Sequence, residues 1–248
     1  GSVPFEFSAK ASADWVKLSH SSGKIAVEQQ IAVSVDWSKA QTGLNNAEVH
    51  IQGTGWGGAK IQLAAVKPAT TATQGFIEAD GYIAIEAASG KTVANNKQAW
   101  WQEIPGHGRT HSSMSAMTVP DYQSAALTQA PYLEYPLFFH STGSFTLHSI
   151  VAPTLDLVPE RGLRFAVTLD NGPPQLVDTL ADNSQQVWEK SVLDGVRIIK
   201  SPLQVTKPGA HTLRIYLVDP ALVLQKLLID TGGLKPSYLG PQQSKRLR

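Results

Sequence analysis

The apolar residues of this chain fall in short runs with a period of two, and turn-forming residues separate the runs. In the first third, Ile31, Val33 and Val35 alternate with polar residues, and Ile61 and Leu63 do the same. Such alternation gives a strand one apolar face. Strands do not alternate with long helices, which argues against a parallel α/β enzyme. The pattern therefore predicts an all-β protein.

A break in this pattern divides the chain into two predicted domains. Residues 3–67 are predicted to form a small β-sandwich, and the polar, proline-led segment 68–75 is predicted to be a linker. Strand-length runs resume over 76–241, which indicates a second sandwich or a jelly roll. The last residues, 242–248, are expected to be a disordered basic tail.

The second domain has seven predicted strands and two segments that also fit a helix. Asp219-Pro220 resembles the start of a helix, but a turn that leads into the strand 224–230 is the interpretation that we favour. Residues 185–193 place Trp188 and Val192 four positions apart, which fits a short helix as well as it fits a loop. The expected strands are 82–86, 133–139, 145–150, 163–169, 196–199, 211–218 and 224–230.

Composition excludes several classes of function. The 21 basic and 20 acidic residues nearly balance, which argues against nucleic acid or an anionic membrane surface as the main partner. The absence of cysteine excludes a disulfide framework, a zinc–thiolate site and a cysteine nucleophile. The longest apolar run, 221–229, is interrupted by Gln225 and Lys226 and is too short to span a membrane. The Gly-Ser start without a signal peptide leads us to expect a piece excised from a larger protein.

Residues 53–58 fit the dinucleotide-binding pattern G-x-G-x-x-G, but the context does not. That function needs a helix after the glycines to hold the pyrophosphate. Here an alternating run containing Ile61 and Leu63 follows, and Pro68 comes soon after it. We therefore expect a hairpin loop. No G-x-S-x-G motif or catalytic triad stands out either, so no catalytic residue is predicted.

Two histidines, His107 and His111, flank Arg109 in a loop. Their spacing resembles a pair of zinc ligands, but a zinc site needs a third ligand and usually a helix that brings both rings to one face. The Pro105-Gly106 sequence indicates a turn instead. A polar loop that contacts a ligand is the alternative that we favour.

Aromatic residues are the other candidates for ligand binding. Trp100 and Trp101 are adjacent, so on a strand one ring faces the core and the other faces outward. The outward ring is either a lone surface residue or a platform on which a sugar ring stacks. Tyr122 and Asn183 lie in expected loops and could supply hydrogen bonds.

Acidic residues are densest around Glu78, Asp80 and Glu86. On a strand, Glu78 and Asp80 would point to the same side. This group is either an oxygen-ligand site for a cation such as calcium or a solvated strand edge.

The second domain contains an ordered series of motifs that spans 76–241. The series comprises the sequences IEADGYIAIEA (77–87), WQEIPGHGRT (101–110), LEYP (133–136), VAPTL (151–155), Trp188 with VLDGV (192–196), PGAHTL (208–213), VDPALVLQK (218–226) and GGLKPSYLGP (232–241). This series resembles the C-terminal domain of glycoside hydrolase family 115 α-glucuronidases. The first domain, with Trp15 and Trp37 among the matching residues, is similar to the BACON or immunoglobulin-like module that can precede it.

The resemblance implies a parent enzyme that removes glucuronic acid, or its 4-O-methyl form, from xylan side chains. It places the catalytic residues in an upstream region with a barrel, for which 248 residues leave no room beside two sandwiches. The second domain is then similar to jelly-roll carbohydrate-binding modules, which often hold structural calcium near the first strand. Glu86 stands at that strand, whereas Gln225 or Lys226 occupies the matching acidic position of the last strand.

The main hypothesis is a non-catalytic accessory region of an extracellular or periplasmic enzyme of hemicellulose degradation. It would bind or position plant cell-wall glucuronoxylan, with His107, Arg109 and His111 contacting the sugar acid and Trp100 or Trp101 stacking on a sugar ring. The alternative is a purely structural role, in which both domains brace the catalytic domain of the parent chain or form a homodimer contact. Apart from calcium, no cofactor is expected.

Overall fold

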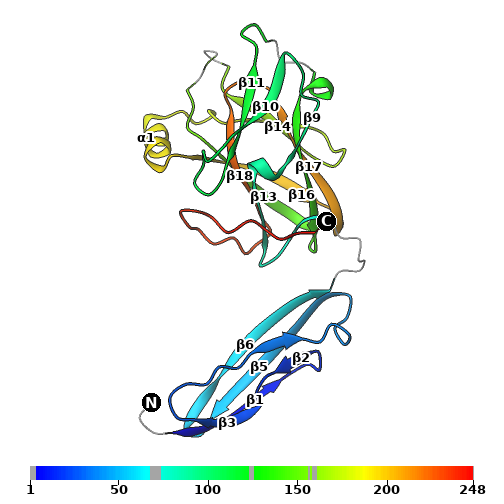
Figure 1. Ribbon diagram of the computed structural model, residues 1–248, viewed down its shortest axis with the longest axis vertical. Coiled ribbons are helices and arrows are strands. Elements are labelled where there is room, and N and C mark those ends of the chain that lie inside the picture. Colours follow the sequence, from blue (N-terminus) through cyan, green and yellow to red (C-terminus); the bar gives the residue numbers. More distant parts are fainter. Residues whose placement is uncertain (1–3, 68–73, 123–125, 156, 158–160, 248) are drawn as a thin grey trace. The chain divides into compact units, whose positions relative to one another are not determined.

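A computed structural model describes residues 4–67, 74–122, 126–155, 157 and 161–247 (Figure 1). The chain divides into two compact units, unit 1 (Gly1–Ala72) and unit 2 (Thr73–Arg248). The predicted linker, 68–75, lies outside the described residues except for Gln74 and Gly75, and Gly75 begins a strand. No helix among the described residues is long and apolar enough to cross a membrane.

The described part of unit 1 contains two antiparallel sheets. One sheet has the order β3-β1-β5-β6, and the other consists of β2 and β4. Trp15, Val16 and Val49 belong to its small core. The strands are β1 (Phe5–Ala11), β2 (Val16–Leu18), β3 (Ser22–Ile25), β4 (Val33–Val35), β5 (Gly43–Gly53) and β6 (Trp56–Lys67).

The glycine-rich segment 53–58 is the turn of a hairpin, as its sequence context predicts. β5 and β6 pair antiparallel on either side of Thr54 and Gly55. Gly55 has a φ of 77°, which favours glycine because other residues are strained there. A strand, not a helix, follows these glycines, so the segment lacks the helix N-terminus that would hold a pyrophosphate.

Unit 2 is a sandwich of two sheets. Sheet C has the order β15-β14-β17-β12-β7-β19, with β9 also paired to β12, and sheet D has the order β10-β11-β18-β13-β16, with β8 also paired to β18. The strands are β7 (Gly75–Ile77), β8 (Tyr82–Glu86), β9 (Lys91–Val93), β10 (Ala99–Ile104), β11 (Ser113–Thr118), β12 (Tyr132–Phe139), β13 (Gly143–Val151), β14 (Arg164–Leu169), β15 (Gln175–Asp178), β16 (Arg197–Val205), β17 (Gly209–Leu217), β18 (Val223–Asp230) and β19 (Arg246–Leu247).

The core of unit 2 fills the space between the two sheets. Sheet C contributes fully buried side chains such as Tyr135 and Phe165, and sheet D contributes Ile83, Leu147 and Ile229. From β12 to β18 the chain changes sheet at every connection except the one between β14 and β15. This path is that of a jelly roll, and the all-β prediction is confirmed.

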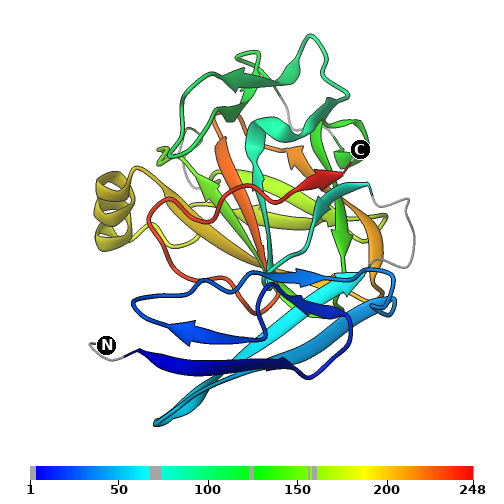
Figure 2. The ribbon, with the colours of Figure 1, turned by 60° about the horizontal axis from the view of Figure 1, so that its bottom comes forward.

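The ambiguous segment 185–193 is helical. Helix α1 (Gln185–Asp194) connects β15 of sheet C to β16 of sheet D and lies at one side of unit 2 (Figures 1 and 2). It ends at Gly195, whose φ of 65° gives the left-handed C-terminal cap that glycine favours. The spacing of Trp188 and Val192 is therefore that of a helix, and this helix lies in the connection between the two sheets.

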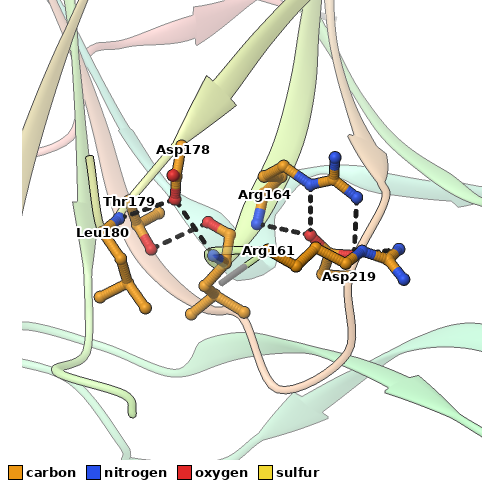
Figure 3. Close-up of polar contacts among 7 residues, drawn as sticks. Arg161, Arg164, Asp178, Thr179, Leu180 and Asp219 are labelled. Carbon is orange, nitrogen blue, oxygen red and sulfur yellow. Dashed lines mark hydrogen bonds and ion pairs between the residues drawn. The ribbon is translucent and has the colours of Figure 1, made fainter. Parts of the chain in front are cut away.

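An ion cluster fixes the start of β14 to the segment after β17 (Figure 3). Asp219 is 2% exposed, and its carboxylate lies 2.5 Å from Arg161 Nη2 and 2.8 Å from Arg164 Nε. The hydrogen bond to Asp219 raises the pKa of Arg164. Beside them, Asp178 accepts hydrogen bonds from the backbone N–H groups of Leu163 and Leu180. Because Asp219 is buried between two guanidinium groups, its negative charge is compensated.

The expectation of a disordered tail is wrong. β19 pairs antiparallel with β7 and forms an edge of sheet C (the red arrow in Figure 2). Ile77 N–H donates to the carbonyl of Lys245, and the Arg246 guanidinium lies 5.3 Å from the centre of the Phe76 ring. A basic composition does not prevent strand pairing, because the ladder uses main-chain groups, and the exposed edge of β7 offers unpaired ones.

Candidate functional site

The outer face of sheet D, opposite the core, carries the residues that form the floor of a cavity. His148 and Ile150 of β13 lie on this face because they alternate with core residues along the strand. Across the ladder, His148 pairs with Lys200 of β16, and Ile150 pairs with Ile198. The same face therefore offers both apolar surface and titratable groups.

A β-bulge in β18 directs two consecutive polar side chains to this face. Ile150 pairs with Lys226 and Val151 pairs with Leu224, so Gln225 is the extra residue. Gln225 and Lys226 both line the cavity, while Leu224 lies in the core. A bulge of this kind interrupts the period of two and redirects the side chains of the bulged strand.

An irregular segment, residues 231–243, forms one wall of the cavity, and we call it the strap. It is the red loop of unit 2 in Figure 1. At its start, Asp230 Oδ1 accepts hydrogen bonds from the N–H groups of Gly232 and Leu234. At its end, the Gln243 side chain accepts a hydrogen bond from Glu86 N–H. Both ends of the strap are thus anchored to sheet D.

Arg109 fastens the middle of the strap. Its Nε and Nη2 atoms donate to the carbonyl oxygen of Asp194 at the end of α1, and Nη1 donates to the carbonyl oxygen of Tyr238 at 2.7 Å. The guanidinium also lies 4.1 Å from the centre of the Tyr238 ring. Since the fork of Nε and Nη2 already serves Asp194, it is not free for a sugar carboxylate. Arg109 was expected to bind the carboxylate of a sugar acid, but in the structure its guanidinium holds the strap to the end of α1.

The cavity between the strap and sheet D has a volume of about 400 Å³. Its lining combines basic, acidic and apolar groups, and the rim includes the Tyr238 side chain, which is 67% exposed. The titratable and charged lining residues are Arg109, His111, His148, Lys200, Lys226 and Lys235 on the basic side, with Glu86 and Asp230 on the acidic side.

A buried ion pair lies at one end of this cavity. Lys226 Nζ is 3.0 Å from Glu86 Oε1, and both residues are buried. Thr110 donates a second hydrogen bond to the same carboxylate oxygen at 2.8 Å. The Glu86 carboxylate thus already has a cationic partner in Lys226.

Glu78, the other residue expected to bind calcium, lies elsewhere and is saturated by hydrogen bonds. Its carboxylate accepts from the N–H groups of His140 and Ser141 and from the Ser141 hydroxyl. Burial acts to raise the pKa of Glu78, but these hydrogen bonds outweigh burial and hold the pKa below its usual value. Among the described residues, no three His, Asp or Glu side chains gather as a metal site would require. Calcium binding stays a prediction.

The two tryptophans are resolved into one core residue and one surface residue. Trp101 is 3% exposed, and its indole N–H donates to the carbonyl of Pro131. Its ring therefore cannot stack on a sugar, and that assignment is corrected. Trp100 is half-buried on β10, and its N–H donates to the Gln102 side chain. Trp100 is not among the residues that line the cavity.

The other predicted site residues divide into those that line the cavity and those that do not. Arg109 and His111 line the cavity. The loop residue His107 does not, and its Nδ1 lies 3.0 Å from Ser113 Oγ. Tyr122 packs against the core of unit 2, and Asn183 is exposed just before α1; neither lines the cavity.

Sequence reasoning missed His148, Lys200 and Tyr238. The first two are brought together only by the pairing of β13 with β16, because they lie far apart in the chain. Burial lowers the pKa of His148, the charge of Lys200 lowers it further, and Asp230 acts in the opposite direction. Tyr238 lies within the sequence GGLKPSYLGP, but nothing in that sequence tells that its ring is exposed.

Comparison with known families decides where the chain belongs. The model of the glycosyl hydrolase family 115 C-terminal domain matches residues 75–243. The chain belongs to this family. The match covers the jelly roll with its cavity and strap, and unit 1 lies outside it. No curated protein matches the chain.

Several solved structures are similar to this GH115 C-terminal region. One is BtGH115A, described as a GH115 4-O-methyl-α-glucuronidase with specificity for decorated arabinogalactans, at 20% identity and a TM-score of 0.46. The similarity covers 66% of this chain but 19% of that protein, so the chain spans about a fifth of its length. The C-terminal CBM6 of LamC from Zobellia galactanivorans has 17% identity, a TM-score of 0.40 and coverage of 60% and 98%. A family 35 carbohydrate-binding module from Clostridium thermocellum has 12% identity, a TM-score of 0.38 and coverage of 60% and 96%.

Proposed function

We propose that this GH115 C-terminal region is a non-catalytic, carbohydrate-binding accessory region, and that the cavity under the strap binds a hemicellulose chain, glucuronoxylan in particular. The observation that carries the proposal is the cavity itself. It is about 400 Å³ in volume and has polar groups on an apolar floor, as a site for a few sugar units requires. The exposed ring of Tyr238 at its rim offers a stacking surface.

The charge of the lining supports an acidic glycan. Glu86 and Lys226 neutralise each other, and the Asp230 carboxylate accepts hydrogen bonds from two N–H groups of the strap. Lys200 and Lys235 remain without an ion-pair partner among the described residues. An uncompensated positive charge attracts ligands with carboxylates. Acidic glycans of this kind occur in plant cell walls, so we propose that the protein acts outside the cell or in the periplasm.

Calorimetry with the 248-residue protein tests this proposal. We expect glucuronoxylan to bind, and we expect Tyr238→Ala to lower the affinity about fivefold, as the loss of one ring contact does. The matched control is Trp37→Ala, which removes a half-exposed ring of unit 1 and should leave the affinity unchanged. If no xylan fraction binds, the proposal is wrong.

One observation favours the structural alternative. The end of α1 exposes Leu193 at 86% and Val192 at 53%, and Ile198 nearby is 49% exposed. Exposed aliphatic side chains of this size often mark a contact with another protein. A dimer in sedimentation velocity that Leu193→Asp dissociates would support a structural role, whereas a monomer at all concentrations would argue against dimerisation.

A further inference from the structure

The floor of the cavity pairs a histidine with an unpaired lysine. His148 and Lys200 are direct partners across β13 and β16, so their side chains emerge side by side on the outer face of sheet D. Directly opposed residues have Cβ atoms only about 5 Å apart. Within the described residues Lys200 has no ion-pair partner, and it is exposed to the cavity. An anion lying over this pair would contact both side chains.

The surroundings of His148 do not supply that anion. The strand on its other side, β18, places Leu228 opposite His148, and Asp230 two residues further on. Asp230 carries a charge that acts on His148, but its Oδ1 accepts the N–H groups of Gly232 and Leu234, which orients the carboxylate toward the strap.

The remaining charged groups around the cavity come from β18 and from three further elements. Glu86 of β8 pairs with Lys226 of β18, and the strap adds the basic Lys235. The loop before β11 adds Arg109, whose donors serve backbone carbonyls, and His111. Asp230 is thus the one carboxylate whose charge acts on His148, and Lys200 has no ion-pair partner among the described residues.

We infer that His148 and Lys200 form a subsite for a sugar carboxylate, and that a ligand bound there takes up a proton on His148. The inference rests on the proposed glycan-binding function of the same cavity. In the free protein, burial and Lys200 keep His148 neutral at pH 7, so its pKa lies below 6.5. A carboxylate that arrives beside both groups compensates Lys200 and favours the imidazolium form, which raises the pKa of His148.

The sign of the pH dependence follows from this shift. Because the bound state holds a proton more tightly than the free state, affinity increases as the pH falls through the pKa of His148 in the complex toward its lower pKa in the free protein. It stops increasing when His148 is protonated in the free protein as well. A ligand without a carboxylate would show the opposite or no trend.

Calorimetry on the 248-residue protein tests the subsite with two probes. One is a xylo-oligosaccharide with a glucuronate substituent, and the other is the same compound after reduction of its carboxyl group to an alcohol. We expect the acidic probe to bind about fivefold more tightly at about pH 5 than at about pH 8, with uptake of up to about one proton per ligand. Buffers with different ionisation enthalpies measure that proton.

Two variants assign the effect to these residues. Lys200→Gln should lower the affinity for the acidic probe about fivefold and leave the affinity for the reduced probe unchanged. His148→Gln should abolish proton uptake. The matched control Lys207→Gln changes an exposed lysine outside the cavity and should have no effect. Because Lys200 is exposed, Lys200→Gln is expected to fold. It therefore tests the subsite even if His148→Gln does not fold.

The outcomes separate this inference from the function on which it rests. Equal binding of both probes, or binding without pH dependence, would overturn the carboxylate subsite and leave the glycan-binding function standing. A preference for the acidic probe that survives both variants would also overturn the assignment to His148 and Lys200. Absence of binding by either probe would overturn both proposals.

Discussion

Lys226 is a buried lysine, 3% exposed, and its Nζ lies 3.0 Å from Oε1 of its counter-ion Glu86. Removing one partner of a buried ion pair leaves the other charge without compensation, which destabilises a protein more than the pair stabilises it. We expect Lys226→Met to lower the free energy of unfolding by about 3 kcal/mol, measured by urea denaturation.

The double variant Lys226→Met, Glu86→Gln serves as the control for this pair. Glutamine keeps the acceptor for the Thr110 hydroxyl but removes the uncompensated charge, so part of the lost stability should return. Lys226→Met with wild-type stability would show that solvent reaches Glu86 and that the pair is not buried in solution.

The lowered pKa of Glu78 predicts that the free energy of unfolding depends on pH. Its pKa in the folded protein is lowered from 4.5, so the ionised carboxylate stabilises the fold above that pH, and this stabilisation is lost as the pH falls below it. We expect Glu78→Gln to be about 2 kcal/mol less stable than the wild type at pH 7, and the difference to shrink in acid. Urea denaturation across the acidic range measures both quantities.

Glu103→Gln provides a matched control, because Glu103 is exposed on β10 and forms no ion pair with the other described residues. Its stability should follow the wild-type curve at all pH values. A constant difference between Glu78→Gln and the wild type down to strong acid would contradict the role of ionisation at Glu78.

At the scale of the elements, the strands with clear alternation could be predicted from sequence. Residues 82–86 and 224–230 coincide with β8 and most of β18, because apolar runs of strand length stand out in the sequence even where both faces of the strand are buried. β11, with the sequence SMSAMT, could not be found this way, since its small side chains alternate too weakly. β19 could not either, because a two-residue edge strand depends on its partner and not on its own composition.

The candidate site was predictable only where it lies on loops. Arg109 attracts attention through its neighbours His107 and His111, and it does line the cavity. The polar face of β18 has no sequence signal, because a period of two does not place Gln225 and Lys226 on the same face and only the bulge does. His148 and Lys200 require knowledge of strand pairing, which a single sequence does not supply.

The hydrogen bonds of Arg109 are expected to stabilise the strap against local opening. Its donors join the carbonyls of Asp194 and Tyr238, so it connects the end of α1 to the middle of the strap. We expect Arg109→Ala to speed amide hydrogen exchange over 235–241 at least about tenfold, because local opening then loses roughly 1.5–3 kcal/mol of charge-assisted hydrogen bonding.

The core strands supply the reference for this measurement. Exchange in β12 and β17 of sheet C should not change, since the Arg109 side chain donates to Asp194 and Tyr238 and not to either of these strands. Unchanged exchange over 235–241 would mean that Leu234 and the two anchored ends hold the strap without Arg109.

At the scale of the whole molecule, the two units differ greatly in the core that each can form. Among the described residues, the core cluster of unit 1 contains five buried residues, whereas the main core cluster of unit 2 contains 28. Small domains bury a smaller fraction of their surface and are correspondingly less stable. The two units have separate cores, so two-state unfolding of the whole chain is not expected.

We therefore expect two unfolding transitions in urea, with unit 1 unfolding first and with the smaller dependence on denaturant, since that dependence grows with the surface exposed. Hydrogen exchange followed through the transitions assigns them, because amides of β5 should lose protection before those of β12. Leu147→Ala, in the core of unit 2, should shift only the later transition, by about 3 kcal/mol, and Val49→Ala only the earlier one. A single transition moved by both substitutions would mean that the units unfold as one cooperative body.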